Sequence, residues 1–240
     1  MRYLPILFCF FLLQCNPKKE KADVAKLPET VAGADGQQGT EEAPAPAVDA
    51  APEIKKIDFD TSVWEEVVRL APSIRLDLRY ATDNNFVKTK MYDCPRCFLR
   101  PDVARAVIAA HKILQKKGLG LKMYDCYRPR PIQWKLWKKV PDPRYVADPR
   151  KGSMHNRGMA VDLTIVDSLG KELDMGTDFD FFGREAYHSY AGHSDEVTDN
   201  RVLLLETMEE QGFRPTSTEW WHYSYKPKKY ELADWLWPCK

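Results

Sequence analysis

The sequence predicts an α+β fold: a single compact domain with a small mixed or antiparallel sheet flanked by helices. Two observations predict it. Apolar residues recur with a period of two in some segments and of about 3.6 in others, so both strands and helices are expected. These segments do not alternate regularly along the chain, so the repeated strand–helix–strand order of a parallel α/β fold is missing.

Period-two patterns predict strands over residues 74–81, 121–127, 159–166 and 219–225. In the third of these, Val161, Leu163 and Ile165 share one face. Because side chains alternate along a strand, Asp162 and Thr164 must point the other way. An aspartate is therefore expected on the face opposite the apolar one.

Helical patterns are expected over residues 102–117, 131–140 and 198–211. Pro101 stands just before the first, and Gly118 and Gly212 follow the first and the last. Proline is favoured where a helix starts and glycine where it ends, so these residues support the predicted boundaries.

The first fifteen residues have the pattern of a signal peptide. Arg2 supplies a charged start, and residues 4–13 are almost wholly apolar but too few to span a bilayer. Cys15 follows directly after "LLQ", which resembles a bacterial lipobox and predicts lipidation at Cys15. Secretion with cleavage nearby is the alternative. Both readings predict a periplasmic or cell-envelope protein.

Residues 16–56 are expected to be a disordered linker. They contain no aromatic residue and are rich in Ala, Pro, Gly and Glu, so they cannot bury enough surface to offset chain entropy. About 40 flexible residues span roughly 35 Å, which suits a tether. The folded domain is therefore predicted to occupy residues 57–240.

Composition excludes one class of partner. The chain of 240 residues has a net charge of +1, which gives no electrostatic case for nucleic acid. Contact with a membrane is expected through the N-terminal lipid only.

Cys94, Cys97, Cys126 and Cys239 remain after the signal peptide. An oxidising compartment makes structural disulfides the first expectation for all four. The "CPRC" stretch is also compatible with half of a zinc site or with a redox pair, and the sequence alone leaves these alternatives open.

His155 and Asp162 are candidate metal ligands. A catalytic zinc site needs three protein ligands and one open position. Gly158 permits a turn that brings the histidine back toward the strand that carries the aspartate. Taken alone, the pattern is better explained by a surface histidine and a capping aspartate.

Glu219 and His222 stand three residues apart in "EWWH". A metal-activated water needs a nearby carboxylate that accepts its proton, and a histidine this close can bind the same metal. The chain has no H-E-x-x-H motif, so the common zincin helix is absent. The plain alternative is an aromatic strand with a solvated glutamate.

Arg128 is a candidate for stabilising an oxyanion. Pro129 biases it toward extended backbone, and a strand end can hold a guanidinium over a site. An ordinary surface salt bridge is the alternative.

Together these stretches resemble one family. "SMHNRGMAVDL", "EWWH" and "DCYRP" resemble the zinc D-alanyl-D-alanine dipeptidases of the vancomycin-resistance (VanX) type, as do "DLRYATDNNF", "PDPRYVADPRKG" and "DMGTDFDFF". The resemblance implies hydrolysis of the D-Ala-D-Ala dipeptide, with one Zn²⁺ per chain in a central cleft, and the signal peptide places this activity outside the cytoplasm. The alternatives are a D,D-carboxypeptidase that acts on peptidoglycan stem peptides and a non-catalytic zinc-bearing binding module.

The resemblance also implies roles for individual residues. It makes His155, Asp162 and His222 the zinc ligands, Glu219 the catalytic base and Arg128 the transition-state arginine. It places Ser153 and Asp180 in segments that help to bind the dipeptide. The stretch "GREAYHS" at residues 183–189 departs from the family pattern, which affects the expected substrate selectivity and not the metal site.

The disulfide pairing also follows from the resemblance. It brings Cys97 and Cys126 to the same side of the domain, so these two are expected to pair. Cys94 would then pair with Cys239 and fasten the C-terminal tail.

Overall fold

A computed structural model describes residues 57–239, which lie in one compact unit that spans Ile54–Lys240. The expected signal peptide, the lipidation site Cys15 and the linker over residues 16–56 lie outside the described residues. Within residues 57–239, no helix is long and apolar enough to cross a membrane.

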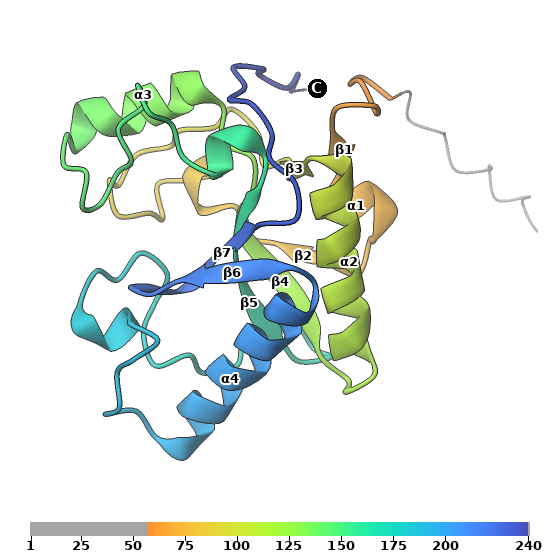
Figure 1. The fold of residues 1–240 in the computed structure, drawn as a ribbon, viewed down its shortest axis with the longest axis vertical. Helices are drawn as coiled ribbons and strands as arrows, with labels where there is room; N and C mark the ends of the chain where they lie inside the picture. The colour runs from red at the N-terminus through yellow and green to blue at the C-terminus, as the bar shows by residue number, and fades with distance from the viewer. Residues whose placement is uncertain (1–56, 240) are drawn as a thin grey trace, which may run out of the picture. The chain divides into compact units, whose positions relative to one another are not determined.

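A mixed five-stranded sheet forms the centre of the domain (Figure 1). The strands lie in the order β2 (Arg75–Leu76), β4 (Gly120–Asp125), β5 (Ala160–Val166), β7 (Glu219–Tyr225) and β6 (Phe213–Thr216). Only the β2–β4 pair is parallel, and the other three pairs are antiparallel. The α+β class and the mixed sheet are confirmed. The strands expected over 121–127, 159–166 and 219–225 correspond to β4, β5 and β7, whereas β6 was not predicted.

Strand β5 is the middle strand, and all seven of its residues are buried. Its register places Asp162 opposite His222 of β7 and opposite Asp125 of β4. A shift in register between Met123 and Asp125 marks an irregularity at the end of β4. Strand pairing alone therefore brings together two of the candidate metal ligands, Asp162 and His222, with Asp125 beside them.

Within residues 57–239, four helices and three short 3-10 turns surround the sheet. They are α1 (Val67–Leu70), η1 (Arg79–Ala81), α2 (Pro101–Gln115), α3 (Arg130–Lys139), η2 (His155–Arg157), η3 (Arg184–Ala186) and α4 (Asp195–Glu210). Helices α2 and α4 contact each other and lie in front of the sheet in Figure 1. A small second sheet pairs β1 (Glu65–Glu66) with β3 (Phe98–Leu99).

The two long helices follow from their sequences. Helix α2 has proline at its first turn and buries Val103, Val107 and Leu114, which share one face at spacings of four and seven residues. In α4 the Ser194 side chain accepts a hydrogen bond from the Val197 N–H, which caps the start of the helix. Because of this cap, α4 begins at Asp195, three residues before the start that the sequence predicts.

The strand predicted over residues 74–81 is wrong for most of its length. Only Arg75–Leu76 pair with β4, and the chain then turns into η1. Asn85 explains the turn, because its buried side-chain amide donates to the carbonyl oxygens of Arg79, Thr82 and Thr89. These local hydrogen bonds replace the ladder that a longer strand would need. The alternating apolar residues still point into the core.

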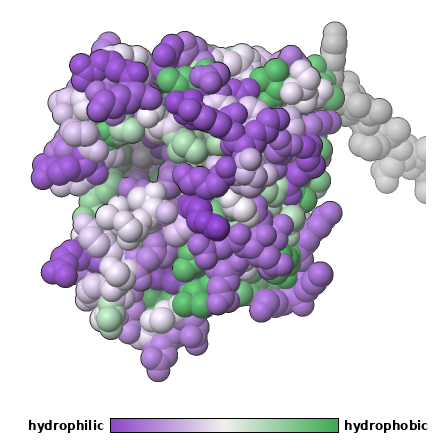
Figure 2. Space-filling model, viewed as in Figure 1, coloured by the Kyte–Doolittle hydropathy of each residue, from purple (hydrophilic) through white to green (hydrophobic). Residues whose placement is uncertain are grey.

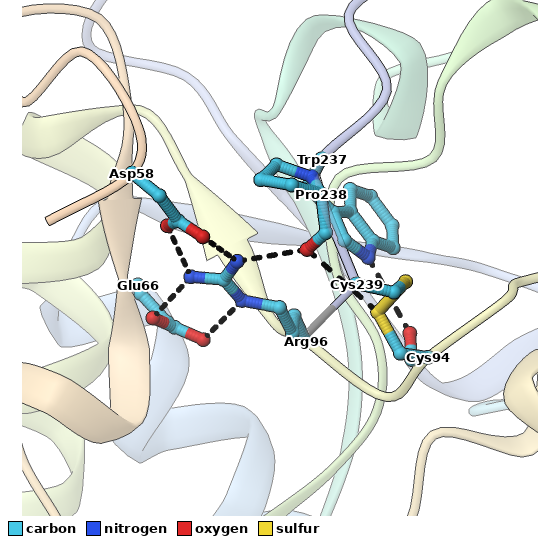
Figure 3. Close-up of a disulfide and its surroundings, with 7 residues drawn as sticks. All are labelled: Asp58, Glu66, Cys94, Arg96, Trp237, Pro238 and Cys239. Atoms are coloured by element: carbon cyan, nitrogen blue, oxygen red, sulfur yellow. Dashed lines mark hydrogen bonds and ion pairs between the residues drawn. A yellow bond between two sulfur atoms is a disulfide. The ribbon is translucent and has the colours of Figure 1, made fainter. Parts of the chain in front are cut away.

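Two disulfides join distant parts of the domain. Cys97 pairs with Cys126, and Cys94 pairs with Cys239 across 145 residues. Figure 3 shows the second bridge beside Arg96, which binds the Asp58 carboxylate and donates to the Pro238 carbonyl oxygen at 3.0 Å. Both ends of the described chain are thus held at one place.

Apolar side chains are largely collected in the interior. The buried core joins the sheet, the helices and the C-terminal tail, in which Trp235 stacks near Trp64 and Trp237 lies against Phe98. The face of the molecule seen in Figure 2 is mostly hydrophilic, with hydrophobic residues in small patches. The tail is therefore part of the core and not an appendage.

The double variant Cys94→Ser/Cys239→Ser is expected to unfold more easily, because the bridge removes entropy from a long loop of the unfolded chain. The loss should be about 2–4 kcal/mol, measured by urea denaturation under non-reducing conditions. As a control, non-reducing peptide mapping of the wild type checks that Cys94 and Cys239 are bonded to each other. Free thiols at both positions, or an unchanged midpoint in the variant, would contradict this account.

Candidate metal centre

His155, Asp162 and His222 converge at one end of the central strand. The His222 Nδ1 atom lies 2.9 Å from Asp162 Oδ1, and His155 Nε2 lies 3.3 Å from Asp162 Oδ2. The two imidazole nitrogens are 3.1 Å apart. The three ligand atoms all lie within 4.8 Å of one another, so they can share one metal ion.

The turn η2 carries His155 to this position. It ends at Gly158, which adopts the left-handed conformation with φ of +68°. A Cβ atom at Gly158 would lie 2.6 Å from Trp64 Cζ3, so both the backbone angle and the available space require glycine. This agrees with the turn that the sequence predicts between His155 and Asp162.

Neighbouring groups orient both imidazoles. His155 Nδ1 lies 2.8 Å from the Cys126 carbonyl oxygen, which can only accept, so Nδ1 carries the proton and Nε2 presents a lone pair. His222 Nε2 lies 3.2 Å from Ser224 Oγ, and in the tautomer that donates to this hydroxyl Nδ1 presents its lone pair. Metal-binding histidines use their second nitrogen in this way.

This arrangement fits a zinc ion. Two imidazole lone pairs and a carboxylate meet in a buried place, and His₂-carboxylate sets with an open fourth position are typical of catalytic zinc. Burial opposes the charged form of Asp162, but His155 and His222 hold the pKa of its carboxyl below the ordinary value. The carboxylate is therefore ready to bind a cation.

Glu219 lies at the edge of this group. Its Oε2 is 3.9 Å from His222 Nδ1, and 26% of its side chain is exposed. Burial raises the pKa of the Glu219 carboxyl above its ordinary value. A carboxylate that is close to the ligands but does not join them has the position that a proton acceptor requires.

Arg128 is buried next to the metal ligands. Its backbone N–H donates to the His155 carbonyl oxygen, and its side chain is paired with Asp125, which is fully buried. The guanidinium also lies over the Tyr80 ring, with Cζ 4.8 Å from the centroid. The surface salt bridge considered from the sequence is wrong, because this ion pair is internal.

The two substrate-binding candidates are placed differently. Ser153 accepts a hydrogen bond from the Asn156 N–H through Oγ at 3.3 Å, so it stabilises the start of the η2 turn. Asp180 has a positive φ of 61° and accepts a hydrogen bond from the Tyr80 hydroxyl at 3.2 Å. Burial and then the charge of Asp162 raise the pKa of Asp180 to about 8. The hydrogen bond places Asp180 beside Tyr80, whose ring also lies against the Arg128 guanidinium.

Sequence reasoning did not single out Asp125, Tyr92 or Asn156. Tyr92 donates to Asp125 at 2.7 Å, and the Asn156 amide donates to the Arg128 carbonyl oxygen at 2.7 Å. Asp125 and Asn156 each lie within three residues of a predicted site residue, and this closeness in sequence was the one indication that they belong to the site. Tyr92 carries no such signal, since only the fold brings it to Asp125.

The remaining histidines lie outside this centre. The His111 ring bonds to Ser73 and the Leu121 N–H, and the His193 ring bonds to the Glu185 carbonyl oxygen. His188 donates through its backbone to Ser217. Across residues 57–239, His155, Asp162 and His222 are the one group suited to a metal ion.

Comparison with known proteins gives consistent matches. Residues 62–234 match a family model described as D-ala-D-ala dipeptidase. The chain is 37% identical to the D-alanyl-D-alanine dipeptidase of Escherichia coli (strain K12) over 164 residues, which covers 68% of this chain and 85% of that protein. It is 31% identical over 191 residues to the Enterococcus faecium protein of the same name, covering 70% and 93%.

A solved structure gives a weaker likeness. The vancomycin-resistance D,D-pentapeptidase VanY in complex with Zn(II) is 18% identical, covers 54% of this chain and 73% of its own, and has a TM-score of 0.35. This likeness is too slight to bear on the site.

The purified protein is expected to carry about one zinc ion per chain. The variants His155→Ala, Asp162→Ala and His222→Ala should each lose it, because each removes one of three ligands. His193→Ala is the control and should keep the metal. The measurement is metal content by plasma mass spectrometry after dialysis. Full zinc content in all three ligand variants would show that other residues bind the metal.

Proposed function

The chain belongs to the D-Ala-D-Ala dipeptidase family of peptidases, and from this premise we propose that it hydrolyses the dipeptide D-Ala-D-Ala with one zinc ion. His155, Asp162 and His222 would hold the ion. The observation that carries the proposal is the convergence of these three ligand atoms beside a carboxylate and a buried guanidinium. Together they supply each group that metal-assisted hydrolysis of an amide needs.

Glu219 acts as general base and then as general acid. When bound, zinc supplies Lewis-acid chemistry that makes water a better nucleophile at neutral pH. The Glu219 carboxylate accepts a proton from the attacking water and returns it to the leaving amino group. Burial raises the pKa of the Glu219 carboxyl, which moves it toward the ambient pH, where a group that must accept and release a proton works best.

Arg128 stabilises the oxyanion that forms on the scissile carbonyl. Its guanidinium stays charged at any working pH and sits in a buried environment, where a charge acts more strongly than in water. Its role is confined to the transition state, since the ground-state carbonyl carries little charge.

Ser153 and Asp180 are proposed to help bind the dipeptide. The Asp180 carboxyl is suited to the ammonium group of a free dipeptide, because a cation there would offset the burial that raises the pKa of Asp180. Ser153 acts from the start of the η2 turn, beside His155.

We place the reaction outside the cytoplasm, with Cys15 as the lipid attachment site. Two disulfides in the described domain support an oxidising compartment, since such bonds are rare in the cytosol. The linker over residues 16–56 would tether the domain to the lipid.

The variant Glu219→Ala should keep its fold and its zinc but lose most activity. Proton transfer by a placed carboxylate typically contributes about 10²–10⁴-fold, so kcat for D-Ala-D-Ala should fall by this order. Metal content is measured on the same samples, with wild type and His193→Ala as controls. Turnover near that of wild type would remove Glu219 from the mechanism.

Free D-Ala-D-Ala should be hydrolysed with a higher kcat/KM than a stem pentapeptide that ends in the same two residues. The reason is that a carboxyl group at Asp180 favours a free ammonium, which the pentapeptide lacks at that position. Release of D-Ala is followed for both substrates. Preference for the pentapeptide would indicate a D,D-carboxypeptidase, and zinc binding without hydrolysis of either would indicate a binding module.

A further inference from the structure

The Arg128 guanidinium is held at more than one point. A guanidinium has five N–H donors. In this structure Nε and Nη2 both donate to Asp125 Oδ2, at 3.0 and 2.7 Å, and Nη1 donates to Gln133 Oε1 at 3.1 Å. One N–H remains on each of Nη1 and Nη2, and these two can donate to an oxyanion.

Asp125 alone does not fix the plane of the guanidinium. Both of its bonds to Arg128 end on the single oxygen Oδ2, because Oδ1 accepts from the Tyr92 hydroxyl at 2.7 Å. A two-oxygen carboxylate fork would fix the plane, whereas contacts that share one oxygen leave the guanidinium free to pivot about it. The Tyr80 ring packs against the face of the guanidinium, but its hydroxyl is directed to Asp180, so it gives the N–H groups no acceptor. A second hydrogen-bonding anchor is therefore needed to aim the remaining N–H groups.

Gln133 supplies that second anchor. It lies in α3, five residues after Arg128, and its side chain is completely buried. Its Nε2 donates to the Ala147 carbonyl oxygen at 2.8 Å. Since a carbonyl can only accept, this bond fixes which end of the amide faces Arg128, and Oε1 must point toward Nη1.

We propose that Gln133 is a positioning residue for the oxyanion-stabilising arginine: it fixes the guanidinium plane of Arg128 so that one N–H of each terminal nitrogen points at the reacting carbonyl. This inference rests on the proposed hydrolysis. It predicts that the Gln133 acceptor affects the transition state more than substrate binding, because misplacing a catalytic group costs rate even where the substrate still binds.

The test compares Gln133→Met, which has a similar length but no acceptor, with Gln133→Glu, which keeps an oxygen for Nη1. Gln115→Met makes the same change at the exposed end of α2 and serves as the control. Steady-state hydrolysis of D-Ala-D-Ala gives kcat and KM for each protein. Gln133→Met should lower kcat by up to roughly 10²-fold with little change in KM and in zinc content, and Gln133→Glu should recover part of the loss.

A second measurement does not depend on turnover. In protein labelled with ¹⁵N-arginine, the Nη resonances of Arg128, assigned with the variant Arg128→Lys, should be resolved in wild type and in Gln115→Met. In Gln133→Met the Nη1 resonance should shift, because Nη1 loses its acceptor, while the Nη2 resonance should move less, because Nη2 stays bonded to Asp125 Oδ2. Merged resonances in wild type, or an Nη1 resonance in Gln133→Met that matches the wild-type one, would overturn the proposal whatever the activity.

The two measurements separate the possible failures. If wild type does not hydrolyse the dipeptide, the proposed function fails, and the resonances alone decide whether Gln133 orients Arg128. If wild type is active and Gln133→Met retains the wild-type kcat, Gln133 has no positioning role in catalysis and the inference fails alone.

Discussion

The crowding of two imidazole lone pairs and a carboxylate around one point is the constraint on which the rest of the structure depends. The nitrogen atoms of His155 and His222 are 3.1 Å apart, and both lie within 3.3 Å of an Asp162 oxygen. Acceptors this close repel each other unless a cation or a proton lies between them. The fold must therefore hold together atoms that would separate if they were free.

The sheet meets most of this requirement. Pairing of β5 with β7 sets Asp162 directly opposite His222, and a one-residue slip would turn one of them to the other face. The complete burial of β5 opposes such a slip. The third ligand depends on the η2 turn, where Gly158 lets the chain pass close to Trp64.

A short segment at the end of β4 connects the metal ligands to the arginine. The Cys126 carbonyl orients His155, while the Arg128 N–H donates to the His155 carbonyl oxygen and the Asn156 amide donates back to Arg128. Cys126 is itself bonded to Cys97, next to β3. This one segment thus fixes the tautomer of His155 and holds the backbone from which the Arg128 side chain extends.

Sequence reasoning reached the parts of the site that have a distinctive local pattern. His155 and Asp162 surround a glycine at the head of an alternating strand, and His222 follows Glu219 at a short spacing, so residue types and periodicity were informative. It did not reach Gln133, because a glutamine in a helix has no pattern that separates a buried anchor from a solvated side chain.

The strand predicted over residues 74–81 failed for a related reason. Its apolar residues do alternate, and Ile74, Leu78 and Tyr80 are buried. The hydrogen bonds of the Asn85 side chain, and not the periodicity, decide where the chain leaves the sheet. Contacts between residues remote in sequence, such as Tyr92 with Asp125, likewise require the fold.

The most direct test of the metal centre is anomalous X-ray diffraction from crystals of the purified protein, with data collected on both sides of the zinc absorption edge. A single strong anomalous peak is expected about 2.0–2.2 Å from His155 Nε2, His222 Nδ1 and an Asp162 carboxylate oxygen. A zinc ion that binds His222 through Nε2, or one that lies at any other group of residues, would contradict the account.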